Sequence, residues 1–123
     1  MEWVFESGQP IYQQLIQILS IRIANGTYPP GSRVPAVREL ALEAGVNPNT
    51  MQRALAELER DELLCTRRTS GRFVTEDQER LGLLRYQLAG GFVTDLCGRL
   101  RKLGLNDEEI IDAVKRGLGS DDG

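Results

Sequence analysis

Four polar side chains that offer hydrogen-bond donors and acceptors lie close together in the chain: Asn49, Thr50, Gln52 and Arg53. Asn and Gln can form paired hydrogen bonds with adenine, Arg can do so with guanine, and Thr suits a phosphate or a thymine methyl group. Acidic residues follow at Glu57, Glu59, Asp61 and Glu62, where a phosphate would be repelled. The first half of this segment is therefore a candidate reader of DNA bases. The alternative is an ordinary solvent-exposed helix face.

A second group, residues 63–75, contains three arginines and no acidic residue, in a chain whose formal net charge is −3. Arginine binds phosphates and is favoured in narrow minor grooves, and a glycine gives a turn its conformational freedom. The alternative is that the charges only deter pairing with another strand edge. The residues of this candidate backbone contact are Arg67, Arg68, Thr69, Ser70, Gly71 and Arg72.

The chain lacks the side chains on which most enzymes and metal sites depend. It contains no histidine and two cysteines, Cys65 and Cys97, so the usual zinc ligand set cannot be assembled within one chain. It has no paired nucleophile and base and no glycine-rich phosphate loop after a strand. We therefore expect no catalysis, cofactor or metal. A redox role for Cys65 stays open, because nearby arginines can activate a thiol.

The surrounding segments predict three helices followed by a hairpin. Apolar residues at helical spacing predict helices over residues 11–23, about 35–44 and 48–60. Gly45 suits the end of the second helix, and Asn47 with Pro48 suits the start of the third. Residues 63–66 and 72–75 have strand character. The order predicts a mainly α fold with a small β-hairpin, a winged helix-turn-helix domain over residues 1–75.

Several ordered motifs in this part match a known family. They are PIYQQL from Pro10, YPPGSRVP from Tyr28, VRELA from Val37, GVNPNT from Gly45 and SGRFV from Ser70. Through them, residues 9–75 resemble the N-terminal DNA-binding domain of the GntR family of bacterial transcription regulators. The short remainder resembles the YtrA subfamily, in which two helices replace a large effector-binding domain.

The resemblance implies a transcription regulator, typically a repressor that covers an operator, and in this subfamily one that controls adjacent transporter genes. It implies a DNA contact for Arg38, which lies off the apolar face of the second expected helix, and it adds Asn47 to the DNA-binding set. A solvated or salt-bridged surface arginine is the alternative for Arg38. The sequence has Ala36 where members often have serine, and Thr69 where many have glycine.

Residues 76–123 are expected to form two helices that pair with a second copy of the chain. An apolar stripe runs from about residue 77 to 103, weakened or bent at its glycines, and Asn106 with Glu109 predicts the start of a last helix. Two helices this short cannot enclose their own apolar residues. Packing back on the winged helix is the alternative. The expected interface residues are Leu84, Leu88, Phe92, Leu96, Leu100, Leu103, Ile110, Ile111 and Val114.

A two-fold homodimer predicts binding to an inverted repeat in double-stranded DNA. Residues 1–75 carry eight basic and eight acidic side chains, so affinity should depend on dimer formation rather than on bulk attraction. We expect a cytoplasmic protein without membrane contact, because no stretch reaches the ~18 apolar residues of a membrane span. A small-molecule effector stays unidentified. The neutral first part leaves one alternative function open, a protein-interaction adaptor that does not read DNA.

Overall fold

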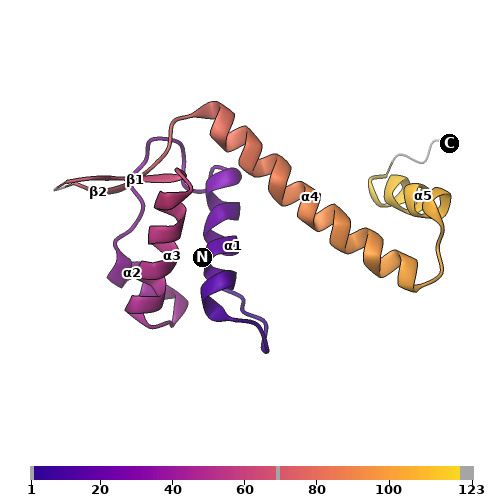
Figure 1. Cartoon of the computed structure of the whole chain (residues 1–123), viewed down its shortest axis with the longest axis horizontal. Coiled ribbons are helices and arrows are strands. Elements are labelled where there is room, and N and C mark those ends of the chain that lie inside the picture. Colours follow the sequence, from indigo (N-terminus) through magenta and orange to yellow (C-terminus); the bar gives the residue numbers. More distant parts are fainter. Residues whose placement is uncertain (1, 69, 120–123) are drawn as a thin grey trace. The chain divides into compact units, whose positions relative to one another are not determined.

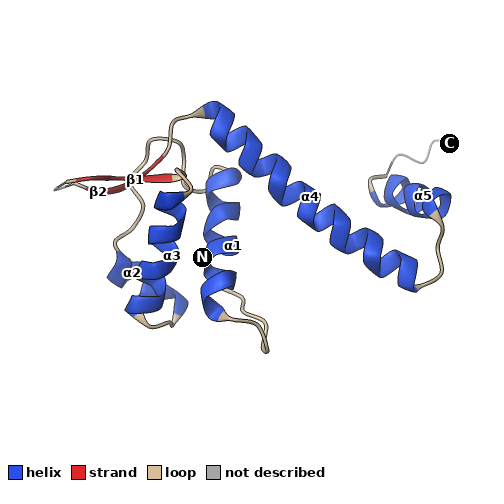
Figure 2. Cartoon of the chain, viewed as in Figure 1, coloured by secondary structure: helices blue, strands red, loops and turns tan. Residues whose placement is uncertain are grey.

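A computed structural model of the chain describes residues 2–68 and 70–119. In this part α1 (Ile11–Ala24), α2 (Val37–Ala44), α3 (Pro48–Arg60), β1 (Leu64–Arg67), β2 (Gly71–Val74), α4 (Gln78–Lys102) and α5 (Asp107–Gly117) follow in order (Figure 1). Helices predominate and the two strands form one antiparallel hairpin, as expected (Figure 2). Contacts divide the chain into two compact units, Met1–Tyr86 and Gln87–Gly123. No helix in the described ranges is long and apolar enough to cross a bilayer.

The turn between α2 and α3 is set by the residues that end one helix and begin the other. Gly45 ends α2 in the left-handed conformation, with φ +70°. Asn47 then caps α3, because its side-chain Oδ1 accepts a hydrogen bond from the backbone N–H of Asn49 at 2.7 Å. Pro48 occupies the first helical position, where its missing N–H costs nothing. The helix-turn-helix predicted from these residues is confirmed.

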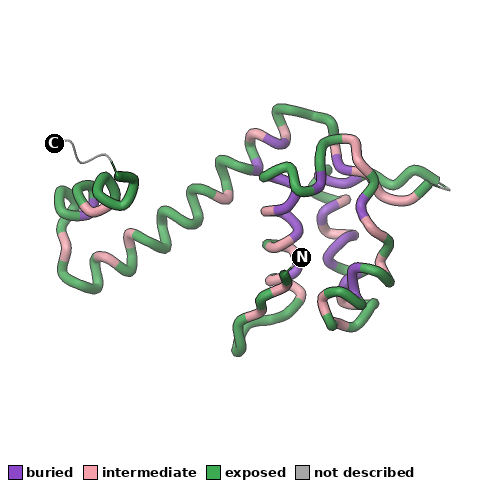
Figure 3. The backbone as a smooth tube through the Cα atoms, turned by 180° about the vertical axis from the view of Figure 1, so that it is seen from behind, coloured by how far each residue is buried: buried purple, intermediate pink, exposed green. Residues whose placement is uncertain are grey.

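The core of the first unit forms where its three short helices and the hairpin meet. Figure 3 shows buried stretches on α1, α2, α3 and the start of α4. Each helix contributes one apolar stripe, and truncating one of these side chains to alanine would cost roughly 2–5 kcal/mol of stability. The largest fully buried side chains are Leu15, Leu19, Leu40, Met51, Leu55, Leu58, Leu63 and Val74.

The first turns of α4 belong to this core. Leu81 and Leu84 are buried, with 3% and 6% of their surface exposed. Arg80 donates from Nε to the backbone carbonyl of Asp61 at the end of α3, and Arg85 donates from Nη1 to the carbonyl of Ala24 at the end of α1, each at 3.0 Å. Leu84 was expected in an interface between copies of the chain. It instead packs within its own chain, because the start of the α4 stripe covers the winged helix.

A buried cation joins the N-terminal segment to α1. Arg22 is 7% exposed, and its guanidinium donates to the Tyr28 hydroxyl at 3.1 Å and to the backbone carbonyl of Glu2 at 2.7 Å. The guanidinium carbon also lies 4.0 Å from the centroid of the Trp3 ring. Burying a charge is costly unless such partners replace the lost water. Residues ahead of α1 are therefore part of the folded unit.

The second unit contains the rest of α4 and α5. α4 is one continuous helix of 25 residues that includes the glycines expected to weaken or bend it. Asn106 and Glu109 form the predicted capping box, each accepting a backbone hydrogen bond from the other at 2.9 Å. Ile110 is buried within its own chain, although it was expected between copies. Large apolar side chains stay exposed at Phe92, Val93, Leu96, Leu103, Ile111, Val114 and Leu118.

Candidate nucleic-acid interface

The polar residues picked out in the sequence lie in the first two turns of α3. Asn49, Gln52 and Arg53 are exposed and Thr50 is half-buried. At 3.6 residues per turn they lie away from the buried stripe of this helix, which consists of Met51, Ala54, Leu55 and Leu58. The side chains of Asn49 and Gln52 have no hydrogen-bond partner in the described part of the chain. They have the exposure that base reading needs.

Arg53 differs from Asn49 and Gln52 because its side chain contacts a residue of α1. Its guanidinium carbon lies 4.2 Å from the centroid of the Tyr12 ring, a cation–π contact worth about 0.5–1 kcal/mol at an exposed site. The Tyr12 hydroxyl lies 3.5 Å from Oε1 of Glu57, one turn further along α3. Arg53 is thus turned toward α1.

Arg38 and Asn47 differ in how much of each side chain is free to bind DNA. Arg38 is exposed on α2, and none of the described residues is bonded to its side chain. It can therefore meet a phosphate without first leaving an ion pair. Asn47 uses its side-chain oxygen to cap α3, while both of its amide N–H groups stay available for another partner.

The hairpin places its tip in solvent. β1 and β2 pair from Leu64 opposite Val74 to Arg67 opposite Gly71. Gly71 has φ +103°, a conformation that other residues rarely adopt. Arg67, Arg68 and Ser70 are exposed, and the Arg67 guanidinium carbon lies 4.4 Å from the centroid of the Phe73 ring. Thr69, also a candidate contact, lies outside the described residues.

Arg72, expected to contact DNA, is paired with α3. Its Nε donates to Oε1 of Glu59 at 2.8 Å, and the Thr66 hydroxyl donates to the other oxygen of that carboxylate. Burial raises the pKa of the Glu59 carboxyl, but these hydrogen bonds and the Arg72 charge outweigh it and hold the pKa below its ordinary value. Glu59 therefore fastens the hairpin to α3.

Arg33 is a cation of this face that sequence reasoning named only within a motif. Its backbone forms a bridge with Phe73, and the neighbouring N–H of Val34 donates to the Arg72 carbonyl at 2.9 Å. Residues 32–34 thus act as a short third strand beside β2. The Nε of Arg33 donates to the Ser70 carbonyl at 2.7 Å. Only the pairing with β2 brings Arg33 to the hairpin, so residue spacing gave no signal for it.

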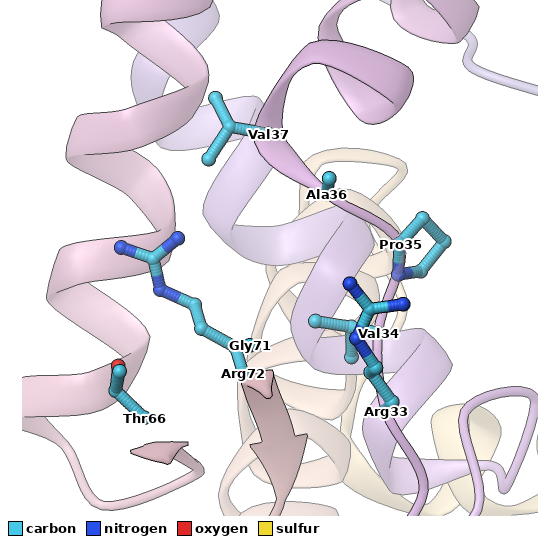
Figure 4. A pocket seen from close by; sticks show the side chains of 8 residues that line it. All are labelled: Arg33, Val34, Pro35, Ala36, Val37, Thr66, Gly71 and Arg72. Carbon is cyan, nitrogen blue, oxygen red and sulfur yellow. The ribbon is translucent and has the colours of Figure 1, made fainter. Parts of the chain in front are cut away.

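A cavity of about 260 Å³ separates the start of α2 from the hairpin. It is smaller than most pockets that enclose a drug-sized ligand. Figure 4 shows the Arg72 side chain extending from β2 toward α3, and the Arg33 side chain extending from the neighbouring segment toward the start of α2. The cavity is lined by Arg33, Val34, Pro35, Ala36, Val37, Thr66, Gly71 and Arg72.

The two cysteines are free thiols, and Cys65 is exposed on β1. The hollow beside Cys65 is lined in part by three acidic residues, Glu59, Glu62 and Asp77. Within the described ranges, no group of three or more His, Cys, Asp or Glu side chains is placed to hold a metal ion.

The chain is similar to known proteins in sequence and in fold. The model of the family "Bacterial regulatory proteins, gntR family" matches residues 11–74. The HTH-type transcriptional repressor YtrA of Bacillus subtilis is 41% identical over 91% of this chain and 77% of its own length. A GntR family transcriptional regulator from Listeria monocytogenes is similar in structure, with TM-score 0.83 and 40% identity over 91% of this chain and 98% of that one. AraR(DBD) in complex with operator ORX1 is similar with TM-score 0.56 and 28% identity, over 61% of this chain and 96% of that one.

Proposed function

We propose a function from one premise: this chain belongs to the gntR family of bacterial regulatory proteins. It is a transcription regulator, and we infer that it is a repressor that binds an inverted-repeat operator as a homodimer. In this proposal Asn49, Thr50, Gln52 and Arg53 meet the major groove, and Arg38, Asn47 and the hairpin tip contact the DNA backbone. In this proposal the protein acts in the cytoplasm, where a chromosomal operator lies.

One relationship within the first unit carries the DNA-binding part of the proposal. Gln52 and Glu59 are two helical turns apart, so they lie on the same side of α3. Glu59 holds the hairpin through Arg72. The basic hairpin is therefore fastened along the side of α3 that presents Gln52. A helix in the major groove with a basic loop beside it can contact base edges and adjacent phosphates together. The operator complex of AraR supports the same mode of binding here.

The second unit supports the homodimer. Phe92 and Leu96 are one turn apart on α4, and they expose 50% and 41% of their surface. Soluble monomers seldom leave large apolar patches uncovered. A second copy would cover such residues together with Leu88, Leu100, Leu103, Ile111 and Val114. Two α3 helices related by a two-fold axis then read half-sites about one DNA turn, or a multiple of it, apart.

The test is selection of sites from a random double-stranded DNA pool, followed by anisotropy titration of the recovered duplex at several salt concentrations. Enrichment of an inverted repeat, bound by two chains with affinity that falls as salt rises, supports the proposal. Transcription in vitro from a promoter that contains the recovered site tests repression. Resemblance to the YtrA subfamily makes promoters of transporter genes beside its own gene the first to examine.

Absence of any enriched site, and of any duplex affinity, contradicts the proposal. The neutral charge balance of residues 1–75 would then favour the alternative, an adaptor whose winged helix binds another protein. Adding candidate metabolites to the selection tests whether a small-molecule effector controls DNA binding. An effector that is needed for binding restores enrichment when it is present.

A further inference from the structure

One arginine outside the hairpin is hydrogen-bonded to the hairpin tip, which we define by its described residues Arg67, Arg68, Ser70 and Gly71. Arg33 lies next to β2 and donates from Nε to the Ser70 carbonyl at 2.7 Å. Among the described residues, no other side chain from outside the hairpin is hydrogen-bonded to the tip. Within the described residues of the tip, the Arg33 hydrogen bond is thus the one side-chain hydrogen bond from the rest of the first unit.

The fit between Arg33 and Gly71 is close. A Cβ atom on Gly71 would lie 2.8 Å from Nε of Arg33 and 3.4 Å from its Nη2. Real side chains do not approach that closely, so the guanidinium takes the space that a side chain at position 71 would occupy. The positive φ of Gly71 also favours glycine.

The outer part of the Arg33 guanidinium is unused. An arginine has five N–H donors, and Arg33 uses the one on Nε. Its Nη1 and Nη2 atoms have no hydrogen bond or ion pair within the described ranges, and the residue is exposed. Arg72, on the same cavity, is neutralised by Glu59. Of the two arginines that line this cavity, Arg33 is the one whose charge is uncompensated (Figure 4).

We propose that Arg33 is a DNA-binding residue: its Nε fixes the hairpin tip while Nη1 and Nη2 donate to a phosphate of the operator backbone. A guanidinium presents parallel N–H groups that suit the oxygens of one phosphate. Such a contact carries no base information but sets the register of the protein on DNA. The inference rests on the proposed function, because it needs an operator.

The experiment compares full-length wild type, Arg33→Gln, Arg33→Lys and Arg99→Gln on the duplex recovered by selection. Affinity is measured by anisotropy at several salt concentrations, and thermal unfolding shows that each variant is folded. Arg33→Gln is expected to weaken binding about tenfold and to lower the slope of log Kd against log salt by about 1 for each half-site. Arg33→Lys keeps the charge, so it is expected to keep the slope while it loses part of the affinity.

Arg99→Gln is the matched control, since Arg99 is exposed in the second unit and paired with Asp95. It removes the same charge and is expected to leave both affinity and slope unchanged. Wild-type affinity in Arg33→Gln would overturn the inference while leaving the proposed function intact. Weaker binding with an unchanged slope would also overturn it, because Arg33 would then only support the tip. Failure of the wild type to bind any duplex would overturn the proposed function, and this inference with it.

Discussion

The Arg53 guanidinium carbon lies 4.2 Å from the centroid of the Tyr12 ring, so the first helix of the chain holds a polar residue of α3. Gln52, its neighbour, has no such partner among the residues described. In the proposed complex, the Gln52 amide would therefore enter the groove without first leaving a partner, whereas the Arg53 guanidinium would enter it while stacked on Tyr12. This difference allows separate tests of base reading and of positioning.

We predict that Gln52→Ala changes the preferred base at one position of each half-site by about 1–3 kcal/mol, because it removes a side chain that reads a base edge. We expect Arg53→Ala to do the same at another position. Arg68→Ala removes a backbone contact, so it should weaken all duplexes about equally and give a shallower salt dependence. Titration of each variant against a panel of single-base operator changes measures both effects. Uniform loss of affinity in all three variants would refute this division.

We predict that Tyr12→Leu uncouples Arg53 from α1. Loss of the cation–π contact should appear in a double-mutant cycle with Arg53→Ala as a coupling of about 0.5–1 kcal/mol in the free energy of unfolding. Tyr12→Phe keeps the ring and loses only the hydroxyl, so it serves as the control and should preserve most of this coupling. A coupling indistinguishable from zero would show that the stacked contact contributes nothing to stability.

We predict a pH-dependent tie between α3 and the hairpin. The folded state lowers the pKa of Glu59, so its contribution to stability is complete above the pKa of the unfolded chain and is lost as pH falls through the folded pKa. Glu59→Gln should therefore lower the free energy of unfolding by about 1–2 kcal/mol at neutral pH, and by less and less as the pH falls through the folded pKa of Glu59. Denaturant unfolding at several pH values measures the difference.

Glu62→Gln is the control for this prediction, because Glu62 is exposed and has no ion pair within the described part of the chain. The free energy of unfolding of the Glu62→Gln variant should follow that of the wild type over the same pH range. A difference between Glu59→Gln and wild type that stays constant with pH would mean that the carboxylate charge is not what fastens the hairpin.

We predict that Leu96→Asp converts the dimer to a monomer at micromolar concentration, because a buried charge in an apolar interface is costly. Affinity for the full inverted repeat should fall at least about tenfold, while affinity for a single half-site should not change. Leu42→Asp adds the same charge at an 84% exposed leucine of α2 and should leave the dimer intact. Sedimentation measures the oligomeric state. A monomeric wild type, both free and on DNA, would refute the homodimer.

The elements with local signals could be predicted from the sequence. α3 runs from Pro48 to Arg60 as expected, since its cap is supplied by the residue just before it. Gly45 and the Asn106 capping box likewise depend on contacts within a few residues. Such signals are complete in a short stretch of sequence, so they do not depend on how distant segments pack.

Contacts between distant segments could not be predicted in the same way. Arg72 has the charge of a DNA contact, but it pairs with Glu59, which lies on α3. Leu84 continues the α4 stripe, yet the winged helix covers it. Arg33 reaches the site only because its segment pairs with β2. Hydrophobic periodicity shows which residues share a face of a helix or strand. It does not show which other segment packs against that face.

The contacts of the buried Arg22 bear on how far the chain can be shortened at its N-terminus without loss of stability. The family model begins at residue 11, but two of the partners that satisfy Arg22 are the Glu2 carbonyl and the Trp3 ring. A chain shortened to the family boundary would keep the proposed DNA-binding residues but lose these two partners of the Arg22 guanidinium, so we expect it to be less stable than the full chain. The folded unit thus includes residues that precede those matched by the family model.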